Sequence, residues 1–522
     1  MYDRRWTAVI VALAVALIAT SSLALHQRAT LSRVRAESAR LTAKVDRLQQ
    51  RVEELADPFG GLFDDLFDNT PDDQSTPDLG APHNGDDDGG LQGLLGRLAD
   101  SLDAPSEGDS AAPSLPDQAE LSACADSEPE THSPPADTEG AEGNPIAVIA
   151  GQVAADRGLD FTAPVDAAFH TSDQVADAVR DDLDDNYPAD QADMDARILT
   201  ALGAIPAGTD LRALVAGLLD AEIAGYYHRD TRQLVVRTDD PDAPLSAAQR
   251  VALAHELQHA LADQTLGLPR HDPDDGDTDA ARAALAVVEG DATLTMQRYA
   301  AAELGVIDLL SVAADNLTAG RDQLDTAPHY LQQELLFPYI QGLRFVCQLY
   351  ADGGWPNVNQ AYNTPPTTTA EVLFPDRYGD QPTNPRDPKP LPAPWTLARQ
   401  DTLGAAELLW LLQAPGGDPT RATDDPGAAA QAWAGGELAL WTDGPDTAIA
   451  IALDEQPGHD RLCASARQWY TAAFPDNHTT TSPNGRHSSH DGQTQDALIT
   501  CTDDQIRIGI APDLKTASHF GL

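Results

Sequence analysis

The segment that most constrains the fold is residues 254–260, which read A-H-E-L-Q-H-A within a helical pattern. Residues four apart lie on the same face of a helix, so His255 and His259 can present two imidazole nitrogens to one metal ion. Glu256 would then lie beside the open coordination position of a tetrahedral zinc. The motif therefore predicts a zinc site of the kind that activates a water molecule. A chance pattern on a core helix is the alternative.

The residues around this motif favour a helix. Ser246 and Gln249 have the spacing of a capping box, and residues 247–264 contain neither Gly nor Pro. A set of small and aliphatic side chains would form its core face: Leu253, Leu257, Ala260 and Leu261. The two histidines are then left on another face.

A catalytic zinc normally has three protein ligands, so one more residue is needed. A third histidine in the pattern H-E-x-x-H-x-x-G-x-x-H is excluded, because Ala262 and Thr265 stand where Gly and His are required. The aspartate-rich stretch 271–279 offers carboxylates but is typical of a solvated loop. Glu289 lies in an apolar part of the helical run 280–304, where a buried charge is costly unless it meets a cation. We therefore expect Glu289 to be the third ligand.

The charge of the chain excludes some partners. Its formal net charge is −50 at pH 7, so it should repel nucleic acid, and we expect no nucleic-acid partner. Its four cysteines are too few for a disulfide scaffold. Cys124 falls in a linker and Cys347 in an expected buried helix, whereas Cys463 and Cys501 are predicted to form a disulfide if this region is outside the cytoplasm.

The first 27 residues are expected to anchor the chain in a membrane. Residues 6–25 are almost entirely apolar and follow two arginines, which is the pattern of a transmembrane anchor or a secretory signal. Residues 28–56 carry a heptad pattern that only Ser38 breaks, which predicts a coiled coil that pairs copies of the chain. A single amphipathic helix is the alternative. Residues 57–144 are rich in Asp, Pro, Gly and Ser and predict a disordered acidic linker.

The expected topology places the N-terminus inside and residues 145–522 outside the cytoplasm. Basic residues that follow the apolar segment outnumber those before it, which by the positive-inside rule favours the opposite orientation. A short tail before an apolar stretch is nevertheless the form of a signal-anchor, and the later basic residues suit the charged flanks of a coiled coil. We therefore expect a single-pass protein of the cell membrane with an extracytoplasmic folded region.

The folded region is expected to have two parts of mixed helix and strand, residues 145–394 and 395–522, and hence an α+β fold. Three helices are predicted first, over residues 172–185, 189–202 and 210–220. The β-like runs 222–227 and 233–237 then predict a hairpin just before the motif helix. An exposed strand there could pair with an extended peptide, although an ordinary structural hairpin is the alternative.

The second part, 395–522, alternates helical and strand-like runs. Helices are expected over 402–412 and 460–474, and strands over 437–441, 447–453, 497–501 and 505–510. His487 and His490 belong to a Gly-, Ser- and Thr-rich stretch that favours a solvated loop over a metal site.

The order of a hairpin, an H-E-x-x-H helix and a glutamate on the next helix resembles the gluzincin group of metallopeptidases, the thermolysin-like clan. More closely, HELQHALADQ at 255–264 and VEGDA at 288–292 are similar to a bacterial protein family that carries HELxHALxDQ and EGDA. The resemblance covers about 211–378, including the motifs at 337–342 and 368–375. Phe374 stands where a histidine is usual in that family, which would weaken activity if that histidine assists catalysis.

The resemblance implies a mainly helical zincin-type metallopeptidase domain with an edge hairpin, which binds Zn²⁺ and cleaves a peptide or protein substrate. His255, His259 and Glu289 would hold the zinc, and Glu256 would act as the general base. Three residues are candidates to stabilise the oxyanion: Tyr339, His329 and Tyr226. Two carboxylates are candidates to orient the imidazoles: Asp263 and Asp291.

The rival interpretation is a catalytically weak or inactive metallopeptidase-like scaffold or binding protein. On that view the coiled coil and the acidic linker carry the biological role, and the folded region only binds. The intact motif and Glu289 count against this interpretation, whereas Phe374 and the long linker count for it.

Overall fold

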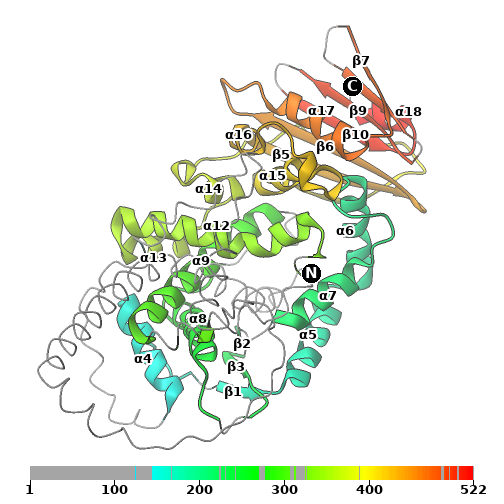
Figure 1. Ribbon diagram of the computed structural model, residues 1–522. Coiled ribbons are helices and arrows are strands. Elements are labelled where there is room, and N and C mark those ends of the chain that lie inside the picture. Colours follow the sequence, from blue (N-terminus) through cyan, green and yellow to red (C-terminus); the bar gives the residue numbers. More distant parts are fainter. Residues whose placement is uncertain are drawn as a thin grey trace, which may run out of the picture. The chain divides into compact units, whose positions relative to one another are not determined.

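The computed structural model describes Cys124 and residues 144–520, apart from 166, 223–224, 230, 241–242, 270–276, 306–307, 309–310, 313–323, 325, 387, 484–486, 493 and 503–504 (Figure 1). The expected anchor at 1–27, the coiled coil at 28–56 and nearly all of the linker at 57–144 lie outside these residues. None of the helices in the described part of the chain combines the length and the apolar character needed to cross a bilayer.

The described residues form a mixed helix and sheet structure, as the α+β expectation requires. The helices are α4 (Pro145–Arg157), α5 (Ser172–Asn186), α6 (Ala189–Ala201), α7 (Leu211–Glu222), α8 (Ala247–Thr265), α9 (Thr278–Glu303), α12 (His329–Gly353), α13 (Trp355–Asn363), α14 (Thr369–Leu373), α15 (Ala405–Gln413), α16 (Pro426–Ala432), α17 (Leu462–Ala473) and α18 (Leu514–Phe520). Short 3₁₀ helices are η4 (Pro375–Arg377), η5 (Pro415–Gly417) and η6 (Pro419–Arg421). The strands are β1 (Ala167–His170), β2 (Gly225–His228), β3 (Gln233–Arg237), β4 (Thr396–Thr402), β5 (Trp433–Asp443), β6 (Asp446–Glu455), β7 (His478–Thr481), β8 (His487–Asp491), β9 (Asp496–Cys501) and β10 (Ile506–Ala511).

A small sheet precedes the motif helix. Its strand order is β1-β3-β2, with β1 parallel and β2 antiparallel to the central strand β3. The predicted hairpin is confirmed as β2 and β3, and Arg232 adopts a positive φ of 53° in the turn between them. Strand β2 is therefore at one end of the sheet, and it packs against α8.

Helix α8 has the predicted capping box. Ser246 Oγ accepts the N–H of Gln249, and the Gln249 side chain accepts the N–H of Ser246. Every residue from Val251 to Ala262 is buried, because α8 packs against the small sheet, α4 and α9. The helix that carries the motif is thus a central element, and its polar residues must find partners inside the protein.

Helices α9 and α12 cross with their backbones in contact. A Cβ on Gly290 would lie 2.2 Å from the carbonyl oxygen of Gly342, and one on Gly342 would lie 2.2 Å from the carbonyl oxygen of Ala286. Only glycine fits at these two positions, since any side chain would force the helices apart. The crossing holds Glu289, next to Gly290, close to Tyr339, one turn before Gly342.

A second sheet of seven strands forms the C-terminal part, in the order β4-β5-β6-β10-β9-β8-β7, with antiparallel neighbours throughout. The predicted helices correspond to α15 and α17, and the predicted strands to β5, β6, β9 and β10. One hydrophobic core joins this sheet to the helices, because Leu438 and Ile508 belong to the same buried cluster as Val346 of α12. The α+β expectation for residues 395–522 is confirmed.

Two disulfides connect the described residues. Cys463 of α17 and Cys501 of β9 are joined as predicted, with their Cα atoms 6.0 Å apart. Cys124 and Cys347 are also joined, with a Cα separation of 5.7 Å, which the sequence did not predict. Arg298 Nη1 donates to the carbonyl oxygen of Cys124 at 3.3 Å. The expected linker is therefore tied to α12 at this residue.

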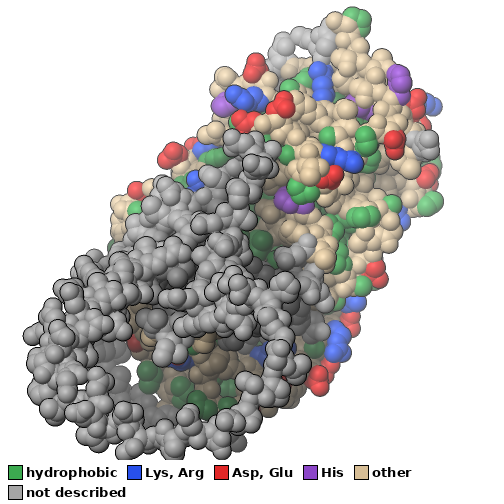
Figure 2. Space-filling model, viewed as in Figure 1, with side chains coloured by type: hydrophobic (Ala, Val, Ile, Leu, Met, Phe, Trp, Pro, Cys, Tyr) green, Lys and Arg blue, Asp and Glu red, His purple; other side chains and the backbone are tan. Residues whose placement is uncertain are grey.

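The surface in view in Figure 2 carries charges of both signs. Acidic and basic side chains are interspersed over the described part of this face. Among the described residues some opposite charges pair locally, and one example is Arg197 with Asp193 at 2.8 Å. On this face the acidity of the sequence is therefore not gathered into one continuous patch.

Candidate metal centre

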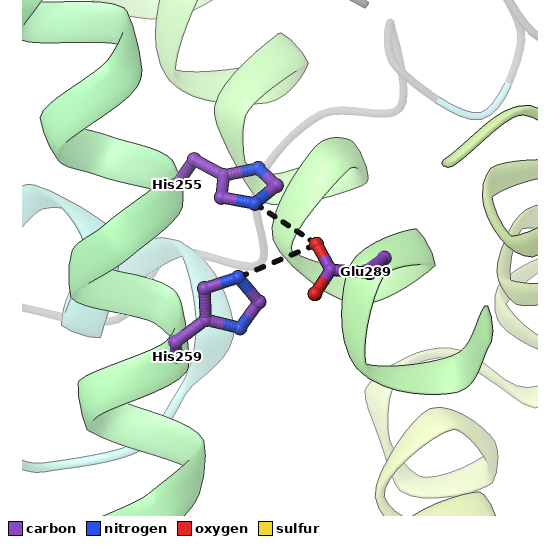
Figure 3. A group of neighbouring side chains, drawn as sticks. All are labelled: His255, His259 and Glu289. Carbon is purple, nitrogen blue, oxygen red and sulfur yellow. Dashed lines mark hydrogen bonds and ion pairs between the residues drawn. The ribbon is translucent and has the colours of Figure 1, made fainter. Parts of the chain in front are cut away.

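Three buried side chains from two helices converge on one point (Figure 3). His255 and His259 come from consecutive turns of α8, and Glu289 comes from the middle of α9. Glu289 Oε2 lies 3.2 Å from His255 Nε2 and 3.5 Å from His259 Nε2. The exposed fractions are 0% for His255 and Glu289 and 3% for His259, so bulk water does not separate these groups. The sequence predicted this set of three.

The spacing of these atoms fits a metal ion. A tetrahedral zinc with nitrogen and oxygen ligands at about 2.0–2.1 Å has neighbouring ligand atoms about 3.3 Å apart. The two distances from Glu289 Oε2 bracket that value, and one ligand atom from each residue lies within 4.8 Å of the others. This buried group can therefore hold a metal ion.

The charges of the group indicate that it needs a cation. Burial lowers the pKa of His255 to about 4, so this imidazole is neutral and can donate a lone pair at pH 7. Burial alone would lower the pKa of His259, but the nearby carboxylates, Glu289 above all, raise it. Burial alone would raise the pKa of Glu289, but the two histidines, His259 above all, lower it. The buried Glu289 carboxylate thus favours a positive charge beside it, a role that a bound metal ion would take.

Glu256 is buried beside the group, with an exposed fraction of 1%. Its Oε2 accepts the backbone N–H of Tyr227 at 2.9 Å, whereas its Oε1 has no hydrogen-bond partner among the described residues. Burial, together with the charge of Glu289, raises the pKa of Glu256 to about 8. A divalent cation in the group would lower this pKa and favour the carboxylate form.

Tyr339 of α12 is the one oxyanion candidate that the structure brings to the group. Its ring lies 6.3 Å from the ring of His255, with 28° between their planes, and its hydroxyl hydrogen-bonds to Glu289. Burial raises the Tyr339 pKa well above its usual range, so the hydroxyl keeps its proton and can act as a donor.

The other two oxyanion candidates, His329 and Tyr226, are not in this position. His329 begins α12, about 15 Å along the helix before Tyr339, and its Nε2 lies 3.4 Å from Gln413 Oε1. The Tyr226 ring packs against the cluster that contains Val175 and Leu219. The structure brings neither residue to the group, because His329 lies ten positions before Tyr339 on α12 and Tyr226 lies on the face of β2 opposite Tyr227.

The two carboxylates expected to orient the imidazoles have other partners. Asp263 Oδ2 accepts the hydroxyl of Tyr227 at 3.0 Å, and its Oδ1 lies 3.7 Å from Arg229 Nε. Asp291 Oδ2 accepts hydrogen bonds from three buried groups: Gln258 Nε2 at 2.7 Å, Tyr362 Oη at 2.8 Å and Arg157 Nη2 at 3.0 Å. Asp263 therefore holds the edge strand, and Asp291 joins helices α4, α8, α9 and α13.

The motif around Phe374 has a structural role in this fold. Glu371 Oε1 accepts the N–H groups of Thr367 and Thr368, which caps α14. Asp279 Oδ2 accepts the N–H of Thr369 and so joins α14 to the start of α9, ten residues before Glu289. Phe374 is partly buried against the main core.

Sequence reasoning missed the residues that surround the centre. Tyr227, Gln258, Tyr362 and Arg157 carry no chemical motif of their own, although Gln258 and the neighbouring Asp263 lie in the motif helix. Asp263 and Asp291 were the available signals, because Asp263 accepts the Tyr227 hydroxyl and Asp291 accepts hydrogen bonds from the other three residues. Comparison of the chain with protein-family models, curated proteins and solved structures found no match.

Proposed function

We propose that this protein is a zinc-dependent peptidase that cleaves peptide or protein substrates with Glu256 as the general base. One observation carries the proposal: three buried ligand atoms have the spacing of a tetrahedral metal site, and the adjacent carboxylate keeps one oxygen without a partner among the described residues. The arrangement supports a gluzincin-like, zincin-type domain in which His255, His259 and Glu289 are the ligands.

Zinc is favoured by the ligand set together with Glu256. Two imidazoles and a carboxylate are the ligands of many hydrolytic zinc sites. Non-haem iron also uses two histidines and a carboxylate, but oxygen activation gives no reason for a buried carboxylate beside the first histidine. Hydrolysis gives such a reason, because the attacking water must lose a proton and a carboxylate beside the metal can accept it.

The chain's own residues can perform the proton transfers. A bound zinc would supply a Lewis acid and lower the pKa of an attacking water. Glu256 Oε1 is free to take the proton of that water while Oε2 stays bonded to Tyr227, and Glu256 can then pass the proton to the leaving amine. The neutral Tyr339 hydroxyl donates its one proton to Glu289 in the structure, and on leaving Glu289 it could donate instead to the oxygen that gains negative charge.

The membrane anchor, the chain-pairing coiled coil and the extracytoplasmic location remain part of this proposal. They rest on the sequence of residues 1–144. Two disulfides in the described part of the chain support an oxidising compartment, since disulfides persist mainly outside the cytoplasm.

The alternative function is a membrane-tethered scaffold or binding protein with weak or no turnover. The burial of the centre favours it, because Glu256 and His255 are exposed by 1% and 0% and a substrate must reach them. An active enzyme would need the residues around the centre to open during the cycle.

Glu256→Gln distinguishes the two functions. The amide keeps the shape of the side chain and loses the base, so zinc should stay bound while hydrolysis of an unfolded protein falls by at least about 10³-fold. Zinc content by mass spectrometry and cleavage with and without chelator measure both effects. Cleavage by Glu256→Gln at the parental rate would refute the mechanism, and zinc-loaded parent protein without any cleavage would support the scaffold.

A further inference from the structure

Tyr227 contacts the motif helix at two points. Its backbone N–H donates to Glu256 Oε2 at 2.9 Å, and its hydroxyl donates to Asp263 Oδ2 at 3.0 Å. Glu256 and Asp263 are seven residues apart on α8, which is about two turns and 10.5 Å along one face of a helix. Tyr227 is 4% exposed. One residue of β2 therefore spans the stretch of α8 from Glu256 to Asp263, which contains His259 and begins directly after His255.

The direction of the Tyr227 N–H follows from the pairing of β2. Tyr226 is opposite Val235 and Tyr227 is opposite Leu234 in the antiparallel ladder. Successive residues of such a strand direct their N–H and C=O groups alternately towards the partner strand and away from it. Because the Tyr227 N–H is bonded to Glu256, it faces away from β3, and the N–H of Tyr226 faces towards it.

We infer that β2 serves to position the general base rather than to offer Tyr227 N–H to a substrate strand. This inference rests on the proposed function. The backbone N–H fixes Oε2 of Glu256, which orients Oε1, without a hydrogen-bond partner among the described residues, for a proton of the attacking water. A hydrogen bond to a carboxylate is among the strong ones, so it can select one orientation of a flexible side chain. Tyr227 is thus a positioning residue.

Asp263 maintains this arrangement through the side chain of Tyr227. Its Oδ2 accepts the Tyr227 hydroxyl, and the hairpin is held a second time where Arg229 Nη2 donates to the carbonyl oxygen of Leu268 at 2.7 Å. These contacts fix the register of β2 along α8. A substrate that pairs with β2 must then use backbone groups other than the Tyr227 N–H.

The test replaces single backbone N–H groups by ester oxygens. An ester at Tyr227, introduced with the α-hydroxy analogue of tyrosine, keeps the side chain and replaces the donor to Glu256 by an oxygen; it also weakens the Tyr226 carbonyl as an acceptor, as the control ester does for the carbonyl before Tyr226. The matched control is an ester at Tyr226, which removes a ladder donor towards β3 without contacting Glu256. We expect kcat to fall by about 10- to 100-fold for the ester at Tyr227, with unchanged KM and zinc content, and by no more than about threefold for the control. Equal effects of the two esters would overturn the inference.

Hydrogen exchange provides a readout that does not need turnover. The Tyr227 amide should exchange at least about 10-fold more slowly in the zinc-loaded parent than in zinc-loaded Glu256→Ala, while the Tyr226 amide stays the same in both. Equal Tyr227 exchange in the two proteins would refute the contact. If the parent cleaves no peptide, the proposed function fails and the catalytic role fails with it, but exchange still decides whether Tyr227 holds Glu256.

Discussion

Replacing Gly290 by alanine would place a methyl group at the crossing of α9 and α12. Its carbon would lie 2.2 Å from the carbonyl oxygen and 2.3 Å from the carbonyl carbon of Gly342, whereas real contacts under 3.0 Å essentially do not occur. Both clashing atoms belong to helical backbone, so side-chain rotation cannot relieve the overlap. The helices would have to separate by about 1 Å.

This separation should lower the free energy of unfolding by about 3 kcal/mol. Overpacking a core costs about 1–3 kcal/mol, and a gap of about 1 Å between packed atoms forfeits up to about half of each dispersion contact along the crossing. Alanine has a higher helix propensity than glycine, which offsets about 1 kcal/mol of this loss in the free energy of unfolding. Because Glu289 precedes Gly290 and Tyr339 lies one turn from Gly342, we also expect zinc affinity to fall at least about 10-fold.

Denaturant unfolding and zinc competition with a chelator measure these two effects. The matched control is Gly151→Ala in α4, where no atom lies within 4 Å of the added Cβ. That variant should be as stable as the parent or up to about 1 kcal/mol more stable, with unchanged zinc affinity. A Gly290→Ala protein with parental stability would refute the reasoning about the crossing.

Two further predictions concern buried polar groups. Tyr339→Phe should keep zinc and lower kcat by about 10²- to 10³-fold in steady-state kinetics, because it removes the proposed oxyanion donor; an unchanged kcat would exclude that role. Burial raises the pKa of Asp279 from 3.8 to about 7, so its contribution to stability is present below pH 3.8 and is lost as the pH rises to 7. In the parent protein, the free energy of unfolding should therefore fall as the pH rises from 4 to 8, and Asp279→Asn should remove the part of this fall that Asp279 causes. An equal dependence on pH in both proteins would contradict this prediction.

The centre itself could be predicted because local patterns and metal chemistry fix it. Helical periodicity places His255 and His259 on one face, and the need for a third ligand selects a carboxylate in an apolar helix, Glu289. The hairpin and the capping box are likewise local. The neighbouring glycine, Gly290, was visible in the sequence, but its requirement becomes evident only from the backbone of α12.

The surrounding residues could not be predicted because long-range packing decides them. Which of Tyr226 and Tyr227 faces α8 depends on the register of β2, and a shift by one residue would exchange them. Asp291 meets Arg157, 134 residues earlier in the chain. The hydrophobic periodicity of the sequence does not predict a contact between residues so far apart in the chain.

The prediction for His490 was wrong for a related reason. Residues 487–490 belong to a Gly-, Ser- and Thr-rich stretch, which predicts a solvated loop. They form most of β8, where pairing with β7 and β9 satisfies the backbone. The ring of His490 is buried against Tyr470, and its Nδ1 lies 2.9 Å from Thr479 Oγ1. Tertiary context overrode the local composition.

The most direct measurement is anomalous diffraction from crystals of the purified protein on both sides of the zinc absorption edge. We predict one zinc ion bound by His255 Nε2, His259 Nε2 and a Glu289 carboxylate oxygen, each at about 2.0–2.2 Å. Glu256 should face the open coordination position. An ion that is iron rather than zinc, or a zinc ion bound elsewhere with Glu289 directed away, would contradict it.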